Sequence, residues 1–412
     1  MKRIFKLIGK SILVLIILAF LLYSGFRIKE YFVGNKYVSY LKKNTLIQSP
    51  IKDTLQLKFD EEFYDNHLFL VGELHEVETS PVIDVAMFKH LHEKINVEVY
   101  LAEMDIAQSY YLNQYLNNSS TQNLNNILKD WVIYIGQVSK AYRKGKWEKL
   151  KYYYQTLPDT KKFKVFGVDK MNDFNLLHTL LKEKVPVEYT IPKGENEIIG
   201  WGTKNIPEIL STHDFEENDR QLLENIHFNI SNLEKIKSRD EFMYKNFHHY
   251  YEQNDWMNKK LYGCFGFYHT LQGLEKTFAG RLNKSNEVNI KEKMISINAI
   301  YTNSHLTVLS SYLPPFIADD TEYTKLAFSH DSMFDYYVMG IEDFKRVGEK
   351  KSINLFQLNA RNSPYNQSLR GTSNFSLLPF WGSINIKDED TVTTDYFQYI
   401  FVVDGADWIK PG

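Results

Sequence analysis

The sequence predicts an α/β protein with a central, mostly parallel sheet flanked by helices, with long helical insertions and an N-terminal transmembrane helix. Two observations support the sheet and its helices. Short apolar runs alternate with long stretches rich in Leu, Lys, Glu, Asn and Tyr, a pattern typical of strands that alternate with helices. The first run, residues 67–72, has the continuous apolar character of a strand buried on both faces. Thr79 and Pro81 then begin a helix with apolar residues at helical spacing.

Five further runs follow the first one along the chain. The predicted strands are residues 97–103, 163–169, 261–268, 294–300 and 396–403. Residues 106–157 and 205–258 are predicted to be helical, and residues 302–395 read as a loop-rich elaboration. The predicted organisation is a signal anchor at 1–28, a juxtamembrane linker at 29–60 and one α/β domain at 61–412.

The N-terminus carries the observation that predicts a membrane location. Four basic residues precede an uncharged run over residues 11–26, which is somewhat shorter than the roughly 20 residues of a full span. No cleavage site follows the run cleanly, so an uncleaved anchor is favoured over a signal peptide. The excess of positive charge before the run predicts a single-pass protein of the cell membrane, with a cytoplasmic N-terminus and an extracytoplasmic domain.

Composition narrows the class of function. Forty-nine basic residues balance 51 acidic ones, so the chain lacks the positive charge that nucleic-acid binding requires. Its single cysteine, Cys264, excludes an intrachain disulfide and a Cys-x-x-Cys site. Any metal would therefore be held by His and carboxylates. The aromatic content of 15% suits an apolar cleft for a small-molecule ligand as well as an ordinary core.

Polar residues follow four of the predicted strands. They are Glu73 and His75, Glu103 and Asp105, Asp169, and His269. Ligands of open α/β sheets bind beyond the carboxyl ends of the strands, so these side chains are expected to share one rim. Such a set suits general acid/base hydrolysis, in which a carboxylate orients a histidine that deprotonates water. It also suits a metal held by His and carboxylates. For Asp169 alone, helix capping is the favoured interpretation.

Five segments in this order resemble the erythromycin esterase and ChaN-like superfamily, to which the Tiki/TraB proteins are related. They are LVGELHEVETSP, VYLAEMDIAQSYYLNQYL, VFGVDK, SRDEFMYKNF and KLYGCFGFYHTLQ. The resemblance implies one pocket lined by Glu73, His75, Glu103 and His269. It also implies that Arg239 begins an Arg-Asp-x-x-Met-x-x-Asn helix next to this pocket, so Arg239, Asp105 and Asp169 are assigned to substrate binding.

Two departures from the esterase pattern bear on the reaction. One residue, Leu74, separates Glu73 from His75 where the macrolide esterases have two, a spacing closer to the haem-associated ChaN branch. Gly266 also stands where the esterases have the first histidine of His-Asn-x-His. The first hypothesis is an esterase-type hydrolase with His75 as general base, which requires no cofactor. The alternatives are a binding protein for haem or another flat apolar ligand, and a divalent-metal peptidase of the Tiki type.

Overall fold

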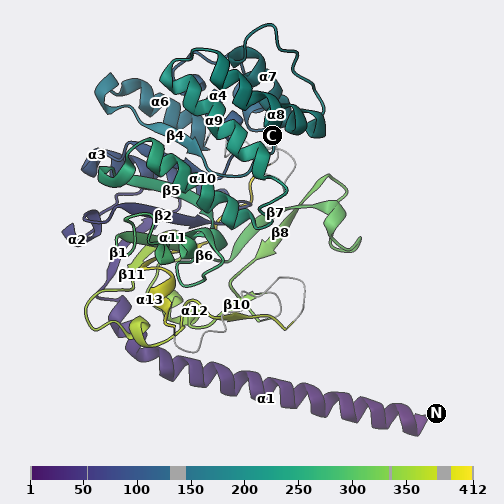
Figure 1. The fold of residues 1–412 in the computed structure, drawn as a ribbon. Helices are drawn as coiled ribbons and strands as arrows, with labels where there is room; N and C mark the ends of the chain where they lie inside the picture. The colour runs from purple at the N-terminus through teal and green to yellow at the C-terminus, as the bar shows by residue number, and fades with distance from the viewer. Residues whose placement is uncertain (1, 53, 130–144, 334–335, 378–390, 411–412) are drawn as a thin grey trace.

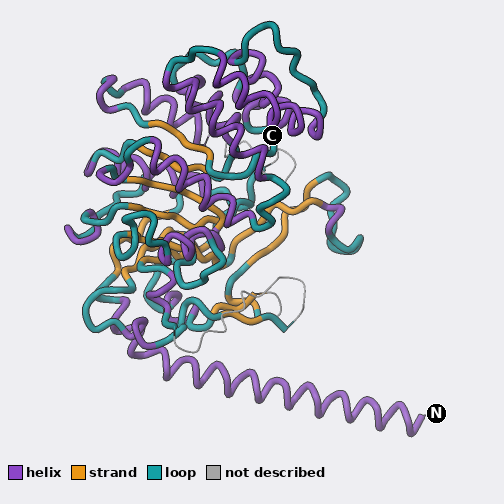
Figure 2. The backbone as a smooth tube through the Cα atoms, viewed as in Figure 1, coloured by secondary structure: helices purple, strands orange, loops and turns teal. Residues whose placement is uncertain are grey.

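The computed structural model describes residues 2–52, 54–129, 145–333, 336–377 and 391–410. A large sheet runs through the middle of the molecule with helices packed around it (Figures 1 and 2). In spatial order its strands are β1 (Thr45–Pro50), β11 (Ser352–Gln357), β13 (Tyr399–Asp404), β6 (Met294–Thr302), β2 (Leu68–Glu73), β5 (Leu261–Gly266), β3 (Val99–Ala102) and β4 (Lys164–Gly167).

The six strands from β13 to β4 are mutually parallel, and β1 and β11 extend the sheet in antiparallel fashion. The six parallel strands are the six apolar runs of the sequence, so the predicted mostly parallel sheet is confirmed. Nearly every residue of β2, β5 and β6 is buried, because helices cover both faces of a parallel sheet.

Helices lie on both faces of the sheet. In chain order they are α1 (Lys2–Leu41), α2 (Glu61–Tyr64), α3 (Ser80–Ile95), α4 (Ile106–Leu116), α5 (Leu124–Ile127), α6 (Glu148–Thr156), α7 (Phe174–Lys184), α8 (Glu195–Thr212), α9 (Glu217–Asn232), α10 (Arg239–Gln253), α11 (Phe278–Lys284), α12 (Ile341–Lys345) and α13 (Thr393–Tyr396). Tyr100 and Tyr262 hydrogen bond to Asp84 of α3. On the opposite face, Phe166 packs against Tyr250 of α10. Alternate side chains of the strands therefore meet different helix layers.

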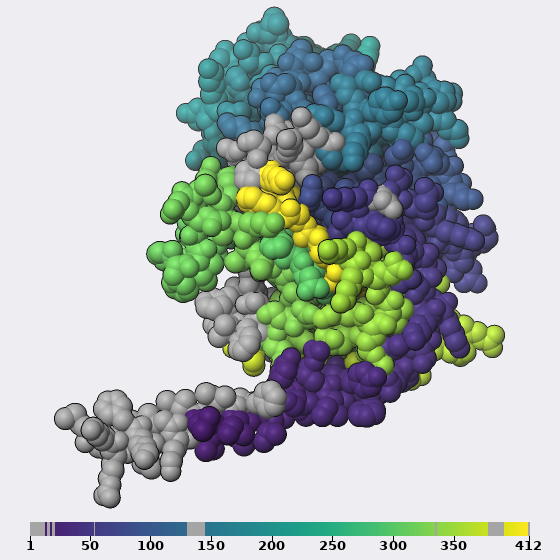
Figure 3. All heavy atoms as spheres, turned by 180° about the vertical axis from the view of Figure 1, so that it is seen from behind, coloured from purple at the N-terminus to yellow at the C-terminus, as the bar shows by residue number. Residues whose placement is uncertain are grey.

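The stretch over 302–395 holds more regular structure than its composition indicates. It contains β11, α12, a hairpin of β7 (Ser304–Leu309) and β8 (Tyr323–Phe328), and a small sheet of β9 (Asp331–Ser332), β10 (Tyr336–Val338) and β12 (Asn374–Phe375). On the back of the molecule, the C-terminal segment lies between this hairpin and the residues that follow β2 (Figure 3). The predicted helical residues 130–144 and the loop residues 378–390 lie outside the described residues.

The N-terminal helix corrects the sequence prediction. In the described part of the chain, no helix is both long enough and apolar enough to cross a membrane. The predicted single-pass location, with its transmembrane anchor and extracytoplasmic domain, is therefore wrong. The helix α1 continues past the uncharged run into charged residues that bind the domain. Arg27 pairs with Glu342 at 2.9 Å, and Glu30 pairs with Arg370 at 2.8 Å.

The contact between α1 and the domain is a buried ionic one. Arg370 bridges Glu30 of α1 and Asp343 of α12, and all three side chains are at most 7% exposed. Gly34 permits this approach, because a Cβ there would overlap a carboxylate oxygen of Asp343. The end of α1, with Tyr37 and Leu41, is part of the hydrophobic core. Residues that the sequence assigns to a linker thus contribute a helix end and the strand β1 to the fold.

Candidate active site

Three neighbouring strands bring the candidate site together. The order β2-β5-β3 places their carboxyl ends side by side at one edge of the sheet. Glu73 is the last residue of β2 and pairs in register with Gly266, the last residue of β5, while Glu103 follows directly after β3. Residues almost 200 positions apart in sequence therefore meet above one edge, as the spacing of the apolar runs predicts.

His75 lies between two carboxylates. Its Nδ1 is 2.9 Å from Glu73 Oε1, and its Nε2 is 3.6 Å from Glu103 Oε2. The first distance is that of a hydrogen bond, whereas the second leaves Nε2 facing Glu103 across a gap. The imidazole is 22% exposed and both carboxylates are at most 5% exposed. His75 is thus held through Nδ1, and its Nε2 faces Glu103.

These carboxylates determine the charge of His75. Burial lowers the pKa of the imidazole, but Glu103 and the hydrogen bond to Glu73 more than offset this effect and raise the pKa to about 9. The ring therefore carries a proton at neutral pH. A group in this state donates a proton readily, and it becomes a base only when the pH approaches 9.

Glu103 is the centre of the site. Its Oε2 accepts the backbone N–H of Gly266 at 2.7 Å, and its Oε1 pairs with Arg239 at 2.8 Å and lies 3.7 Å from His269 Nε2. Burial alone would raise the pKa of Glu103, but His75, His269 and Arg239 lower it to about 2. This carboxylate therefore stays ionised, and its negative charge favours the protonated form of both histidines.

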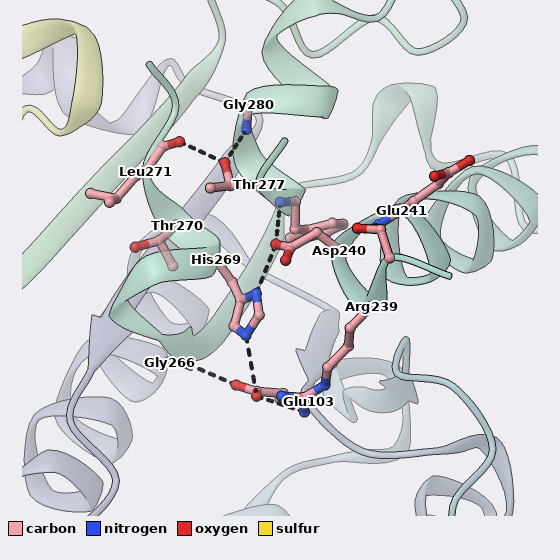
Figure 4. Close-up of polar contacts among 12 residues, drawn as sticks. Glu103, Arg239, Asp240, Glu241, Gly266, His269, Thr270, Leu271, Thr277 and Gly280 are labelled. Carbon is pink, nitrogen blue, oxygen red and sulfur yellow. Dashed lines mark hydrogen bonds and ion pairs between the residues drawn. The ribbon is translucent and has the colours of Figure 1, made fainter. Parts of the chain in front are cut away.

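The first turn of α10 contributes two charged residues to the site. Arg239 donates to both carboxylate oxygens of Asp169, at 3.0 Å from its Nε, and also reaches Glu103. The next residue, Asp240, accepts a hydrogen bond from the ring of His269 (Figure 4). Deeper along the same helix, Asn246 donates to the carbonyl oxygens of Val168 and Asp169, which fixes the helix against the end of β4.

His269 is oriented by Asp240. Its Nδ1 lies 2.7 Å from Asp240 Oδ1, which also accepts the backbone N–H of Phe278 at 2.7 Å. Burial lowers the pKa of His269, whereas Asp240 and Glu103 raise it by more, so the net direction is upward. Gly72 allows the turn that carries His269 to pack on β2, because a Cβ at Gly72 would lie 2.6 Å from Thr270 Oγ1.

The site residues assigned to substrate binding have different surroundings. Arg239 and Asp169 form an ion pair that adjoins Glu103. Asp105 is 1% exposed and its carboxylate is bonded to backbone N–H groups, as the N-cap of α4 and as acceptor from Asn172 and Asp173. Burial raises the pKa of Asp105 to about 6. The carboxylate of Asp105 therefore holds the backbone of the loops around the site. Asp169 pairs with Arg239, and Asp173 is the N-cap of α7.

Sequence reasoning missed Asp240 as a member of the site. An acidic residue in the first turn of a helix ordinarily reads as a partner of the helix dipole. The signal that could have identified it was its place beside Arg239 in the segment SRDEFMYKNF, whose polar residues Arg239, Asp240 and Asn246 all face the strand ends.

The contacts of the two histidines bear on the metal and haem alternatives. Each ring has its Nδ1 bonded to a carboxylate and its Nε2 directed at Glu103. Within the residues that the structure describes, no group of three or more His, Cys, Asp or Glu side chains could hold a metal ion.

The α/β fold is similar to that of several solved structures, one of them an erythromycin esterase, so the predicted resemblance is confirmed at the level of the fold. A Bacillus cereus protein aligns with a TM-score of 0.64 and 13% identity over 92% of this chain and 99% of that one. A succinoglycan biosynthesis protein aligns at 0.60 and 14% over 92% and 99%. A variant of an erythromycin esterase in its open conformation aligns at 0.54 and 13% over 87% and 97%. No protein-family model and no curated protein sequence matches the chain.

Proposed function

We propose that this chain is a hydrolase of the esterase type, in which water activated by His75 attacks the carbonyl carbon of an ester, lactone or amide. The observation that carries the proposal is the pair of imidazoles on Glu103. Each ring has its own carboxylate behind it, and their Nε2 atoms lie 3.6 and 3.7 Å from the two oxygens of Glu103. Two histidines in this arrangement can divide the roles of base and electrophile.

In the proposed reaction, neutral His75 takes a proton from water at Nε2 while the water oxygen bonds to the carbonyl carbon. Glu73 fixes the ring through Nδ1. The oxyanion that forms accepts a hydrogen bond from Nε2–H of His269 in its protonated form, which Asp240 and Glu103 favour. His75 then returns its proton to the leaving alkoxide or amine, and the bond from the carbonyl carbon to that group breaks.

Arg239 acts as a positioning residue in this scheme. Its guanidinium joins Asp169 to Glu103, so it holds the central carboxylate in the orientation that both histidines use. The low pKa of Glu103, about 2, makes it an electrostatic support that is too weak a base to accept the proton itself.

The test is a panel of aryl and alkyl esters, lactones and amides incubated with the purified full chain. We expect hydrolysis of at least one member, and a loss of roughly 10²–10⁴-fold in kcat for His75→Gln and Glu103→Gln. His178→Gln is the matched control, because His178 is a partly exposed residue of α7 with no described contact to the site residues. Absence of turnover across the panel, or equal turnover in both site variants, would refute the assignment.

A further inference from the structure

A cavity lies away from the candidate active site, against the outermost strand of the sheet. It has a volume of about 300 Å³, is open on one side, and is bordered by α4, β4, α9 and the end of α10. Lys164, the first residue of β4, is on its wall, whereas Asp169 of the active site lies beyond the carboxyl end of the same strand. The two sites are thus at opposite ends of β4.

The wall of this cavity is unusual in its chemistry. Seven of its side chains are Asn or Gln, among them Gln114 on α4 and Asn218 and Gln221 on α9. Three aromatic rings, Tyr110, Phe166 and Tyr250, complete the lining. An amide offers both donors and an acceptor, and an aromatic ring offers a flat apolar face.

Charge contributes little to the cavity. Its charged side chains are Lys164 and Asp219, and Asp219 is bound by Lys184 at 2.6 Å. A phosphate or carboxylate ligand would require several cations aimed at one point. The lining therefore favours a neutral ligand that carries many hydroxyl groups.

Two of the polar side chains on this wall are themselves largely buried. Tyr250 is 5% exposed and is part of the cavity wall. Asn225 is 6% exposed and donates from Nδ2 to Gln253 at 2.9 Å, which leaves its Oδ1 as an acceptor on the cavity wall. A tyrosine hydroxyl and an amide oxygen can each form a hydrogen bond with a hydroxyl group of a ligand.

We infer that the cavity between α4, α9 and α10 binds a neutral saccharide ring. The sugar hydroxyls would bond to the Tyr250 hydroxyl and the amides, and the apolar face of the ring would pack against Tyr110 or Phe166. The volume lies at the small end of ligand pockets, which suits one sugar unit with its neighbours extending along the exposed amides of α9. This site is independent of hydrolysis at the strand ends.

Isothermal titration of the full chain with methyl glycosides of glucose, galactose, mannose and N-acetylglucosamine, each at up to about 20 mM, tests the inference. We expect at least one glycoside to bind with a dissociation constant in the millimolar range or tighter. Tyr250→Phe and Gln114→Ala should each weaken it by about 2–10-fold, and their combination should weaken it further.

Matched controls keep the result interpretable. Tyr152→Phe and Gln155→Ala change the same residue types on the exposed face of α6 and should leave binding unchanged. Glu103→Gln should also retain full binding, because it alters only the active site. Absence of binding by all four glycosides, unchanged affinity in the Tyr250→Phe and Gln114→Ala double variant, or loss of binding in Glu103→Gln would each overturn the inference.

Discussion

Glu103→Gln removes the negative charge at the centre of the site, and the ionisation of His75 measures how much of the electrostatics depends on that charge. In the wild type the pKa of His75 is raised from 6.5 to about 9. The difference corresponds to about 3 kcal/mol in favour of the charged ring. Glu103 is the first of the carboxylates that raise this pKa, ahead of Glu73. Neutralising it should lower the pKa of His75 by about one to three pKa units.

The assay is an NMR titration of histidine ring signals in the full chain labelled at the imidazole carbons. The His75 signal is assigned by its absence in His75→Gln. Glu62→Gln, which removes an exposed carboxylate on α2, is the matched control and should leave the titration of His75 where it was. Glu73→Gln should also lower the pKa, because Glu73 holds Nδ1 at 2.9 Å.

Two results would refute the reasoning. One is a wild-type His75 that titrates at or below 6.5, since the two carboxylates would then have no net effect on it. The other is a His75 pKa that is the same in Glu103→Gln as in the wild type. Either result would show that the 3.6 Å approach of Nε2 to Glu103 does not couple the two groups in solution.

Two further predictions concern the partners of the site and the anchoring of α1. Asp240→Asn should lower the pKa of His269 and reduce kcat on the best panel substrate by about 10²-fold with little change in KM, because the oxyanion loses a charged donor; an unchanged kcat would remove His269 from that role. Arg370→Met leaves the buried carboxylates Glu30 and Asp343 without their cation, so the free energy of unfolding measured in urea should fall by about 3–5 kcal/mol. Arg361→Met, at an exposed position, should cost less than about 0.5 kcal/mol.

The parallel part of the sheet was predictable because a strand that is buried on both faces has a simple sequence pattern. Each of its six strands is a short, continuous apolar run. The antiparallel strands lack this pattern. The edge strand β1, with the sequence TLIQSP, has a single buried residue, Ile47, and ends in proline, and β11 lies within a stretch dominated by turn residues. Both strands form because they pair with neighbouring strands in the folded protein, and the local sequence does not reveal this pairing.

The candidate site was predictable to the extent that strand ends determine it. Glu73, Glu103 and His269 each follow an apolar run, so their convergence follows from topology. Asp240 follows no strand, and its contribution depends on how α10 packs across the sheet. Likewise, the capping role of Asp105 depends on the approach of Asn172 and Asp173 from the next loop, which spacing along the chain does not specify.

The carboxylates that position His75 also favour its protonated form. The stability of the fold and the proposed activity therefore depend on the same groups. A pKa raised in the folded state stabilises the fold fully below pH 6.5, and this stabilisation is lost as the pH rises through about 9. The neutral ring that can accept a proton from water appears over that same range. For the proposed hydrolase, kcat/KM should therefore rise toward pH 9 while up to about 3 kcal/mol of stability is lost. A substrate that separates His75 from Glu103 would lower the pKa and bring the base into use nearer neutrality, so the gap between them is where binding and catalysis are coupled.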